Sequence, residues 1–225
     1  MNRSFASDPS DPLLIGLAGR SCSGKSSIAQ SLVEFLPPTT TIVLPIDHYY
    51  RDLAAIDPAQ RHLFNFDAPQ SIDLPLLLDN LRGLKAGSQV EKPRYLFPEH
   101  VRAPEGELVE PHACVIVEGL FALYWEEVRR LMSVRVFVEA PDEVCLQRRV
   151  KRDVEERGRS EESILSQYTE TVNPMYRRFV VPTRAFAHVL VQGTEPVARS
   201  ARSIYRTIAS TSISHFPNTA SDRPL

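Results

Sequence analysis

The stretch Leu13-Leu-Ile-Gly-Leu-Ala-Gly19-Arg-Ser-Cys-Ser-Gly24-Lys25-Ser26 decides the fold. Its apolar first half has the length of a buried strand, and a helical pattern follows directly after it. Between the two, the spacing Gly-x-x-x-x-Gly-Lys-Ser matches a phosphate-binding loop in its strand–loop–helix context. The alternative is a chance glycine turn before a helix, which leaves the full eight-residue pattern unexplained.

The residue types of this loop suit a phosphate for physical reasons. The two glycines let the backbone bend so that successive N–H groups and a helix N-terminus face an anion. Lys25 adds positive charge near the β- and γ-phosphates of a nucleotide, and the Ser26 hydroxyl can ligate Mg²⁺. The phosphate-binding set predicted here comprises Gly19, Ser21, Ser23, Gly24, Lys25, Ser26 and Ser27.

Short apolar runs alternate with longer helical patterns along the rest of the chain. The runs 13–18, 41–46, 113–117, 134–138 and 188–191 have the β-branched content of buried strands. Helical patterns cover 25–36, 72–85, 121–132, 143–156, 162–179 and 196–208. This alternation predicts an α/β fold with a mostly parallel sheet covered by helices on both faces, a three-layer αβα sandwich. Ligands of such sheets bind beyond the carboxyl ends of the strands.

Composition indicates an ordinary globular protein. The 225 residues predict one domain at 13–210, and tails rich in Pro, Ser and Asp, predicted to be disordered, at 1–12 and 211–225. The net charge of −2 argues against a nucleic-acid partner, and the apolar runs are too short to span a membrane. The first residues lack the hydrophobic centre of a signal peptide, so we expect a cytoplasmic location.

One stretch, 89–111, interrupts the alternation. It contains Pro93, Pro98, Pro104 and Pro111, which suppress helix formation. The stretch is too long for a turn, and long excursions in compact domains are usually functional. We therefore predict an irregular β-hairpin excursion.

Two carboxylates follow predicted strands. Glu118 ends the run Val-Ile-Val-Glu118 next to the predicted phosphate loop, where it could hold Mg²⁺, although a solvated strand-end glutamate is the alternative. Asp47, in Leu-Pro-Ile-Asp47-His-Tyr-Tyr50, ends the apolar run that follows the phosphate loop along the chain. Its carboxylate could take a proton from an attacking hydroxyl and could also reach the metal, and the alternative is a helix N-cap.

At these residues the chain resembles the uridine kinase (uridine–cytidine kinase) family, within the phosphoribulokinase/uridine kinase group of P-loop kinases. The resemblance covers roughly 13–193 and rests on motifs in a fixed order. They are the phosphate loop, Asp47-His-Tyr-Tyr50, Asn65-Phe-Asp67, Tyr95-x-Phe97-x-x-His100, Glu118-Gly119, and the run from Arg149 through Arg152-Asp153, Arg157-Gly-Arg159 to Gln167-Tyr168. The last run is long and specific to the family.

The resemblance implies a role for each matching residue. Asp47 would be the catalytic base, Lys25 would act on the phosphates, and Ser26, Glu118 and Asp47 would hold Mg²⁺. The nucleoside-binding residues would be Asp67, Tyr95, Phe97, His100, Arg149 and Gln167. Arg152, Arg157 and Arg159 would lie on an Arg-rich helical lid at about 148–162 and act on the triphosphate.

These residue types also make chemical sense by themselves. Aromatic faces stack on a base, a histidine can donate or accept toward its polar atoms, and arginines stabilise a transferring phosphoryl group. Two alternatives stay open on the residues alone. The arginine-rich stretch could be a solvated helix with ion pairs four residues apart, and Tyr95 and Phe97 could be packing residues.

The sequence thus predicts an enzyme that phosphorylates the 5′-hydroxyl of uridine or cytidine, with ATP as donor and Mg²⁺ as cofactor. Two rivals remain at this point: a kinase for another small alcohol such as a sugar phosphate or pantothenate, and a non-catalytic nucleotide-binding regulator. The resemblance also implies a homo-oligomer, a dimer or a tetramer.

Overall fold

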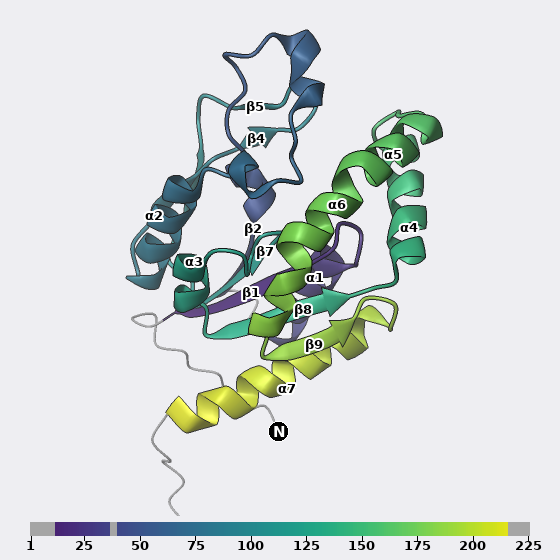
Figure 1. Cartoon of the computed structure of the whole chain (residues 1–225). Coiled ribbons are helices and arrows are strands. Elements are labelled where there is room, and N and C mark those ends of the chain that lie inside the picture. Colours follow the sequence, from purple (N-terminus) through teal and green to yellow (C-terminus); the bar gives the residue numbers. More distant parts are fainter. Residues whose placement is uncertain (1–11, 37–39, 216–225) are drawn as a thin grey trace, which may run out of the picture.

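The computed structural model of the chain, shown in Figure 1, describes residues 12–36 and 40–215. Its central sheet has five strands in the order β2-β7-β1-β8-β9. These are β1 (Leu13–Gly19), β2 (Thr41–Pro45), β7 (Cys114–Glu118), β8 (Val134–Glu139) and β9 (Val189–Gln192). Every pairing between them is parallel, which confirms the predicted parallel sheet.

Helices cover both faces of this sheet (Figure 1). On one face, α1 (Lys25–Phe35) and α7 (Val197–His215) pack against a cluster that includes Ile15 and Leu17. On the other, α2 (Leu74–Lys85) and α3 (Glu126–Leu131) pack against a cluster that includes Leu14 and Ala18. Alternate residues of β1 thus enter opposite cores, because side chains along a strand point to opposite faces. The three-layer αβα sandwich is confirmed.

The remaining elements lie mainly above the carboxyl ends of the strands. They are η2 (Ile46–Tyr49), η3 (Pro58–Leu63), η4 (Pro69–Ser71), β3 (Val90–Lys92), β4 (Tyr95–Leu96), β5 (Val101–Arg102), β6 (Glu107–Val109), α4 (Asp142–Glu155) and α5 (Glu161–Gln167). The chain then continues through η5 (Tyr168–Val172), α6 (Asn173–Met175), η6 (Tyr176–Val180) and η7 (Val181–Phe186). The pairs β3–β6 and β4–β5 are antiparallel, which confirms the hairpin predicted at 89–111.

The helix predicted at 121–132 is shorter than expected. It begins only at Glu126, because the segment before it forms successive turns. The carbonyls of Leu123 and Tyr124 accept hydrogen bonds from Arg129 Nη1. The Tyr124 ring packs edge-on against Phe179, so a contact with a distant element accompanies the loss of the first helical turns.

The helix predicted at 162–179 is continuous but not regular. It starts as α5 and runs to the end of η6, and it widens into π-helix over Tyr168–Val172 and again over Tyr176–Val180. This long element and α4 rise beside the hairpin, as Figure 1 shows. The two widened turns flank Pro174, which has no N–H to donate to the carbonyl four residues earlier.

At the chain ends, α7 continues to His215, so 211–215, predicted to belong to the C-terminal tail, are helical. The other tail residues, 1–11 and 216–225, lie outside the described residues. In the described part of the chain, no helix is both long enough and apolar enough to cross a membrane.

Candidate active site

A cleft of about 780 Å³ lies above the carboxyl ends of the central strands. The phosphate loop and the β7 exit form its floor, the hairpin and the 62–67 segment form one wall, and α4 with α5 form the other. It is lined by Ser21, Cys22, Lys25, Ser26, Asp47, Tyr50, His62, Phe66, Asp67, Tyr95, Phe97, Pro98, His100, Glu118, Gly119, Leu120, Arg149, Arg152, Glu156, Arg157, Arg159, Ser163 and Gln167. Parallel strand ends thus gather residues from distant parts of the chain.

The phosphate loop forms the floor of the cleft. Gly24 and Cys22 both have positive φ angles, of 100° and 61°, so the backbone turns tightly before α1. The Lys25 ammonium is buried and donates to the Arg20 carbonyl at 2.8 Å. Ser23 differs from Ser21 and Ser26, which line the cleft, because its Oγ is fully buried and does not face the cleft. Its contribution to phosphate binding can come only from its backbone.

The turn after β9 supports this loop from below. A Cβ on Gly193 would lie only 1.7 Å from the Ser23 backbone oxygen. The Arg148 guanidinium donates to the Gly193 carbonyl at 3.0 Å. The backbone at 193 therefore touches the phosphate loop as closely as glycine allows.

Two carboxylates and a hydroxyl meet where the strands β2 and β7 end. Ser26 Oγ donates to Glu118 Oε1 at 3.0 Å, and Pro45 pairs with Glu118 in the sheet, two residues before Asp47. In enzymes that act on nucleotide phosphates, Mg²⁺ is usually bound by one or two carboxylates together with the substrate phosphates. These residues suit that ion, although no group of three His, Cys, Asp or Glu side chains in the described residues could hold a metal by itself.

The cleft has two halves, one with the phosphate loop and Glu118 and one with Asp67 and the rings of the hairpin side. Asp47 lies between them. Burial and the nearby charge of Glu118 raise the pKa of its carboxyl to about 6, and Asp67 acts in the same direction. Lys25 opposes this shift. A carboxylate with a pKa closer to neutrality is a better proton acceptor for a hydroxyl, since catalytic groups work best near the operating pH.

Five rings form a wall on the hairpin side of the cleft. His100 stacks on Phe66 with 4.9 Å between ring centroids, and Tyr95 meets Phe97 edge-on at 5.3 Å. Tyr50 packs edge-on against both Phe66 and Tyr95. Burial lowers the pKa of His100 and favours its neutral ring, and Arg61 acts in the same direction. Such a wall presents π faces suited to a flat base.

Two polar groups on this side of the cleft are the Tyr95 hydroxyl, which has no partner in the described protein, and the Asp67 carboxylate, on which the positive charge of Arg149 acts. The Tyr95 hydroxyl is buried without a hydrogen bond, and burial raises its pKa to about 12. The Asp67 carboxylate faces the cleft, and burial raises its pKa. Buried polar groups are usually hydrogen-bonded, so unsatisfied ones in a cleft point to a polar ligand.

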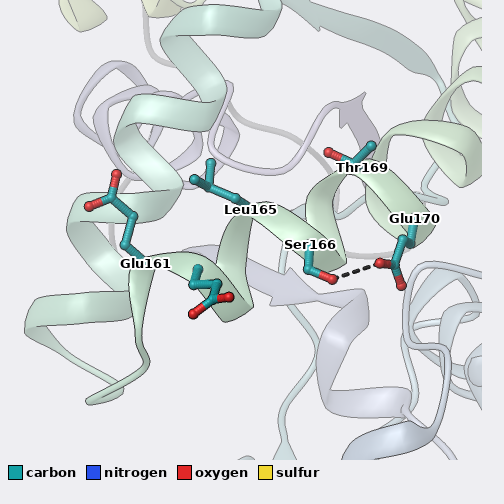
Figure 2. Close-up of a pocket in the computed structure, with 6 residues that line it drawn as sticks. Glu161, Leu165, Ser166, Thr169 and Glu170 are labelled. Carbon is teal, nitrogen blue, oxygen red and sulfur yellow. Dashed lines mark hydrogen bonds between the residues drawn. The ribbon is translucent and has the colours of Figure 1, made fainter.

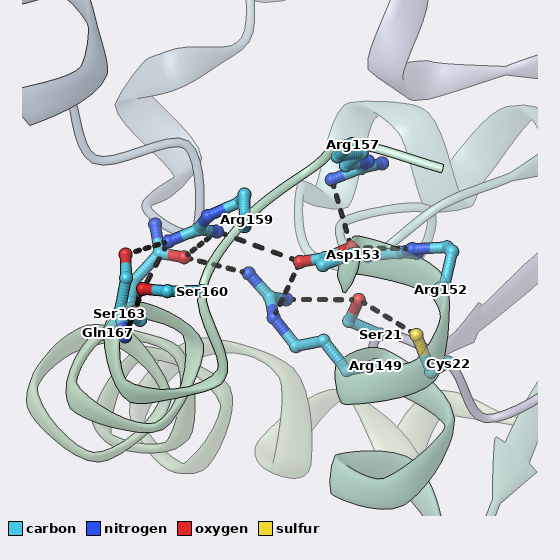
Figure 3. A network of polar contacts seen from close by, with 10 residues as sticks. All are labelled: Ser21, Cys22, Arg149, Arg152, Asp153, Arg157, Arg159, Ser160, Ser163 and Gln167. Carbon is cyan, nitrogen blue, oxygen red and sulfur yellow. Dashed lines mark hydrogen bonds and ion pairs between the residues drawn. The ribbon is translucent and has the colours of Figure 1, made fainter. Parts of the chain in front are cut away.

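The opposite wall is a network of arginines around one carboxylate (Figure 3). Asp153 is fully buried and meets Arg152 Nη2 at 2.8 Å. Arg149, Arg157 and Arg159 contact it at 3.5 to 3.6 Å. The stretch is therefore not a solvated helix, because its central carboxylate lies inside the protein.

Gln167, the last residue of α5, is hydrogen-bonded to two arginines of this network. Its Oε1 accepts from Arg159 Nη1 at 2.7 Å and from Arg149 Nη2 at 3.2 Å. Arg149 also donates to Ser21 Oγ of the phosphate loop at 3.4 Å. The arginine wall thus touches both the loop and the α5 helix (Figure 3).

The cleft brings together most of the residues predicted from the sequence. Gly19, Ser23, Gly24 and Ser27 do not line it: the two glycines have no side chain, Ser23 is buried, and Ser27 is an exposed residue of α1. Tyr50, Phe66, His62 and Asp153 were missed as site residues. Tyr50 and Phe66 adjoin motif residues in the sequence, but only the fold shows that their rings face the same cleft.

A second depression lies on the outer face of α5, away from these groups (Figure 2). It is lined by Glu161, Glu162, Leu165, Ser166, Thr169 and Glu170. Three carboxylates and no basic side chain would repel phosphate, so this depression does not suit a nucleotide.

Comparison with known proteins identifies this arrangement. The sequence profile of the phosphoribulokinase / uridine kinase family matches residues 14–199. The chain belongs to this family. Two of its relatives, both named uridine kinase, agree: that of Chloroflexus aurantiacus is 40% identical and covers 81% of this chain and 87% of its own. The Yersinia pestis protein is 41% identical and covers 80% and 86%. The chain is therefore a kinase, a phosphotransferase.

Solved structures share the fold of this kinase at low sequence identity. Phosphoribulokinase from Rhodobacter spheroides superposes with a TM-score of 0.60 at 16% identity, covering 84% of this chain and 75% of its own. D-glycerate 3-kinase from Cryptococcus neoformans gives 0.55 at 17% identity, covering 75% and 79%. These similarities confirm the P-loop kinase fold.

Proposed function

We propose that this kinase transfers the terminal phosphoryl group of Mg·ATP to the 5′-hydroxyl of uridine or cytidine. The observation that carries the proposal is the place of Asp47 between two differently equipped halves of one cleft. Asp47 lines the cleft together with Glu118 and Asp67. Its Oδ1 lies 3.7 Å from where a Cβ on Gly119, the residue after Glu118, would be. A base in this place could serve an acceptor held beside the phosphates.

The proposed reaction is an in-line transfer. The 5′-oxygen attacks the γ-phosphorus while its proton passes to an Asp47 carboxylate oxygen. The bond from the γ-phosphorus to the bridging oxygen breaks, and that oxygen leaves with ADP. Lys25 and the arginine wall would stabilise the charge that spreads over the transferring group. Ser26, Glu118 and Asp47 would hold Mg²⁺, which when bound neutralises phosphate charge.

The acceptor half supports a nucleoside. Its ring wall suits a flat base, and the unpaired Tyr95 hydroxyl could meet a polar base atom. Asp67 and Arg149 together offer an acceptor and a donor, as a ribose diol needs. The two relatives named uridine kinase, at 40% and 41% identity, support the same acceptor.

The test is ADP release from Mg·ATP in the presence of uridine, cytidine, adenosine, pantothenate or ribulose 5-phosphate. We expect turnover with uridine and cytidine only. Asp47→Asn should lower turnover by about 100-fold or more, the scale expected for loss of a general base. Asp79→Asn, an exposed carboxylate of α2 paired with Arg82, is the matched control and should keep full activity.

The outcomes separate the rivals. Activity on another alcohol but not on the pyrimidine nucleosides would keep the kinase and overturn this acceptor. Near-normal turnover of Asp47→Asn would remove Asp47 from the mechanism. The cytoplasmic location, the absence of a nucleic-acid partner and the assembly into dimers or tetramers stay predictions.

A further inference from the structure

Arg20 is a buried arginine inside the phosphate loop that the proposed chemistry does not use. Its side chain does not line the cleft but points toward α4 and the widened helix. Its Nη1 pairs with Asp142 and donates to Tyr168 Oη at 2.6 Å and to Asn173 Oδ1 at 3.3 Å. The Tyr168 hydroxyl donates in turn to Asp142. These contacts of Arg20 all come from Nη1, and Nε has no hydrogen-bond partner in the described protein, so this one nitrogen anchors the guanidinium to α4 and to the widened helix.

The π-helical turns explain how one helix reaches Arg20 several times. Residues five apart lie about 140° apart around an α-helix, on different faces. In η5, however, the Asn173 N–H donates to the Tyr168 carbonyl, a bond over five residues that stacks the two positions. Both side chains therefore contact the same guanidinium. The Tyr176 ring, in the second widened turn, lies under it at 3.8 Å from Cζ.

The backbone of Arg20 acts at the other end of the loop. Its carbonyl accepts from Lys25 Nζ at 2.8 Å, so the place of this carbonyl sets where the ammonium rests. The next residue, Ser21, accepts from Arg149. Any shift of Arg20 would therefore change the position of the Lys25 ammonium, which is predicted to bind the phosphates.

The helix that holds Arg20 also belongs to the acceptor half. Gln167, directly before Tyr168, contacts Arg149 and Arg159 in the cleft. Asp142 begins α4, the helix that carries Arg149 and Arg152. Arg20 is therefore a rigid link between the phosphate loop and the two helices that close over the acceptor.

We propose that Arg20 is a positioning residue that couples the binding of the acceptor nucleoside to the binding of ATP. An acceptor held by Gln167 and Arg149 fixes the helix, Tyr168 and Asp142 then fix Arg20, and the loop with Lys25 is held ready for the phosphates. This coupling rests on the proposed function for its acceptor. By linkage, each ligand then raises the affinity of the other by the same factor.

The test is the affinity of a non-hydrolysable ATP analogue with Mg²⁺, measured with and without saturating uridine, and the reverse titration. We expect a mutual gain of about fivefold or more in the unmodified kinase, the lower end of typical couplings. Tyr168→Phe keeps the ring but loses both hydroxyl bonds, and should reduce the gain below about twofold. Arg20→Lys keeps the charge but loses the planar guanidinium that stacks on the Tyr176 ring, and should do the same.

Tyr124→Phe is the matched control. Its ring packs against Trp125 and Phe179, contacts that survive the change, and it should keep the full gain. Thermal unfolding checks that each variant is folded. A positioning role also predicts that Arg20→Ala weakens the analogue by about tenfold or more even without acceptor, whereas an unchanged affinity would contradict it.

The results distinguish the two proposals. If both ligands bind the unmodified kinase with independent affinities, or if Tyr168→Phe and Arg20→Lys keep the full gain, the coupling is wrong and the proposed function stands. If uridine and cytidine do not bind at all, the proposed function is wrong. The analogue affinity of Arg20→Ala then still decides the positioning role.

Discussion

Replacing the buried carboxylate of the arginine wall should destabilise the protein strongly. Asp153→Asn keeps the size and shape of the side chain but removes its charge. Asp153 is 0% exposed, and four arginines contact it at 2.8 to 3.6 Å. The variant would leave these guanidinium groups without their shared counter-charge.

The size of the loss in the free energy of unfolding depends on how well each arginine can be hydrated once Asp153 is neutral. Breaking a buried ion pair by removing one partner costs about 3–5 kcal/mol. Arg157 is 51% exposed and Arg152 29%, so both can regain hydration, whereas Arg149 is only 8% exposed. We therefore expect the lower end, a loss of about 3 kcal/mol in the free energy of unfolding.

The assay is urea unfolding at pH 7 without ligands, followed by circular dichroism. Asp79→Asn is the control, because Asp79 and Arg82 are 75% and 58% exposed and 3.8 Å apart. Exposed pairs contribute little, so the control should stay within about 0.5 kcal/mol of the unmodified protein. A loss below about 1 kcal/mol for Asp153→Asn would refute the reasoning that this carboxylate holds the arginines together.

Two further predictions concern the floor of the cleft. Because the pKa of Asp47 is raised from 3.8 to about 6 in the folded state, the folded protein holds this proton more tightly, and stability is lost as the pH rises between these values. Measured by urea unfolding from pH 4 to 7, the free energy of unfolding of Asp47→Asn should therefore rise relative to that of the unmodified protein up to about pH 6. If the two free energies change with pH in the same way, the raised pKa of Asp47 is contradicted. Gly193→Ala would press a Cβ to within 1.7 Å of the Ser23 oxygen. The affinity of the Gly193→Ala variant for an ATP analogue, measured by calorimetry, should fall by about tenfold or more. An unchanged affinity would show that the phosphate loop can move to accommodate the methyl group.

The fold was predictable because its signals are local. The phosphate loop is a continuous pattern, and the five central strands are short apolar runs whose bounds the structure changes by only one or two residues. Because the carboxyl ends of parallel strands meet at one edge of a sheet, Asp47 and Glu118 could both be predicted at that edge. That β2 and β7 are direct neighbours came only from the observed strand order. The hairpin at 89–111 followed from its prolines in the same way.

Tertiary structure decided what depends on contacts between distant residues. The segment before α3 has a helical pattern, yet its Tyr124 ring packs against Phe179. The Arg129 guanidinium, which bonds two carbonyls of the segment, stacks on Phe186. The arginine-rich stretch could be read as a solvated helix until the fold showed Asp153 buried beneath four arginines. Periodicity reports which residues share a face, but it does not report what covers that face.

The chain by itself determined the phosphate loop, the parallel sheet and the two carboxylates at its edge, since each depends on neighbours in sequence or on the rule that parallel strands end at one edge. Only the tertiary structure decided that Tyr50 and Phe66 join the ring wall, and that the helix after Gln167 widens to bring Tyr168 and Asn173 onto Arg20. Pro174 has no N–H to donate and crowds the carbonyl four residues earlier, so a regular α-helix is disfavoured at this point. Only the fold shows that the widened turn carries Tyr168 and Asn173 to an arginine 148 residues before Tyr168.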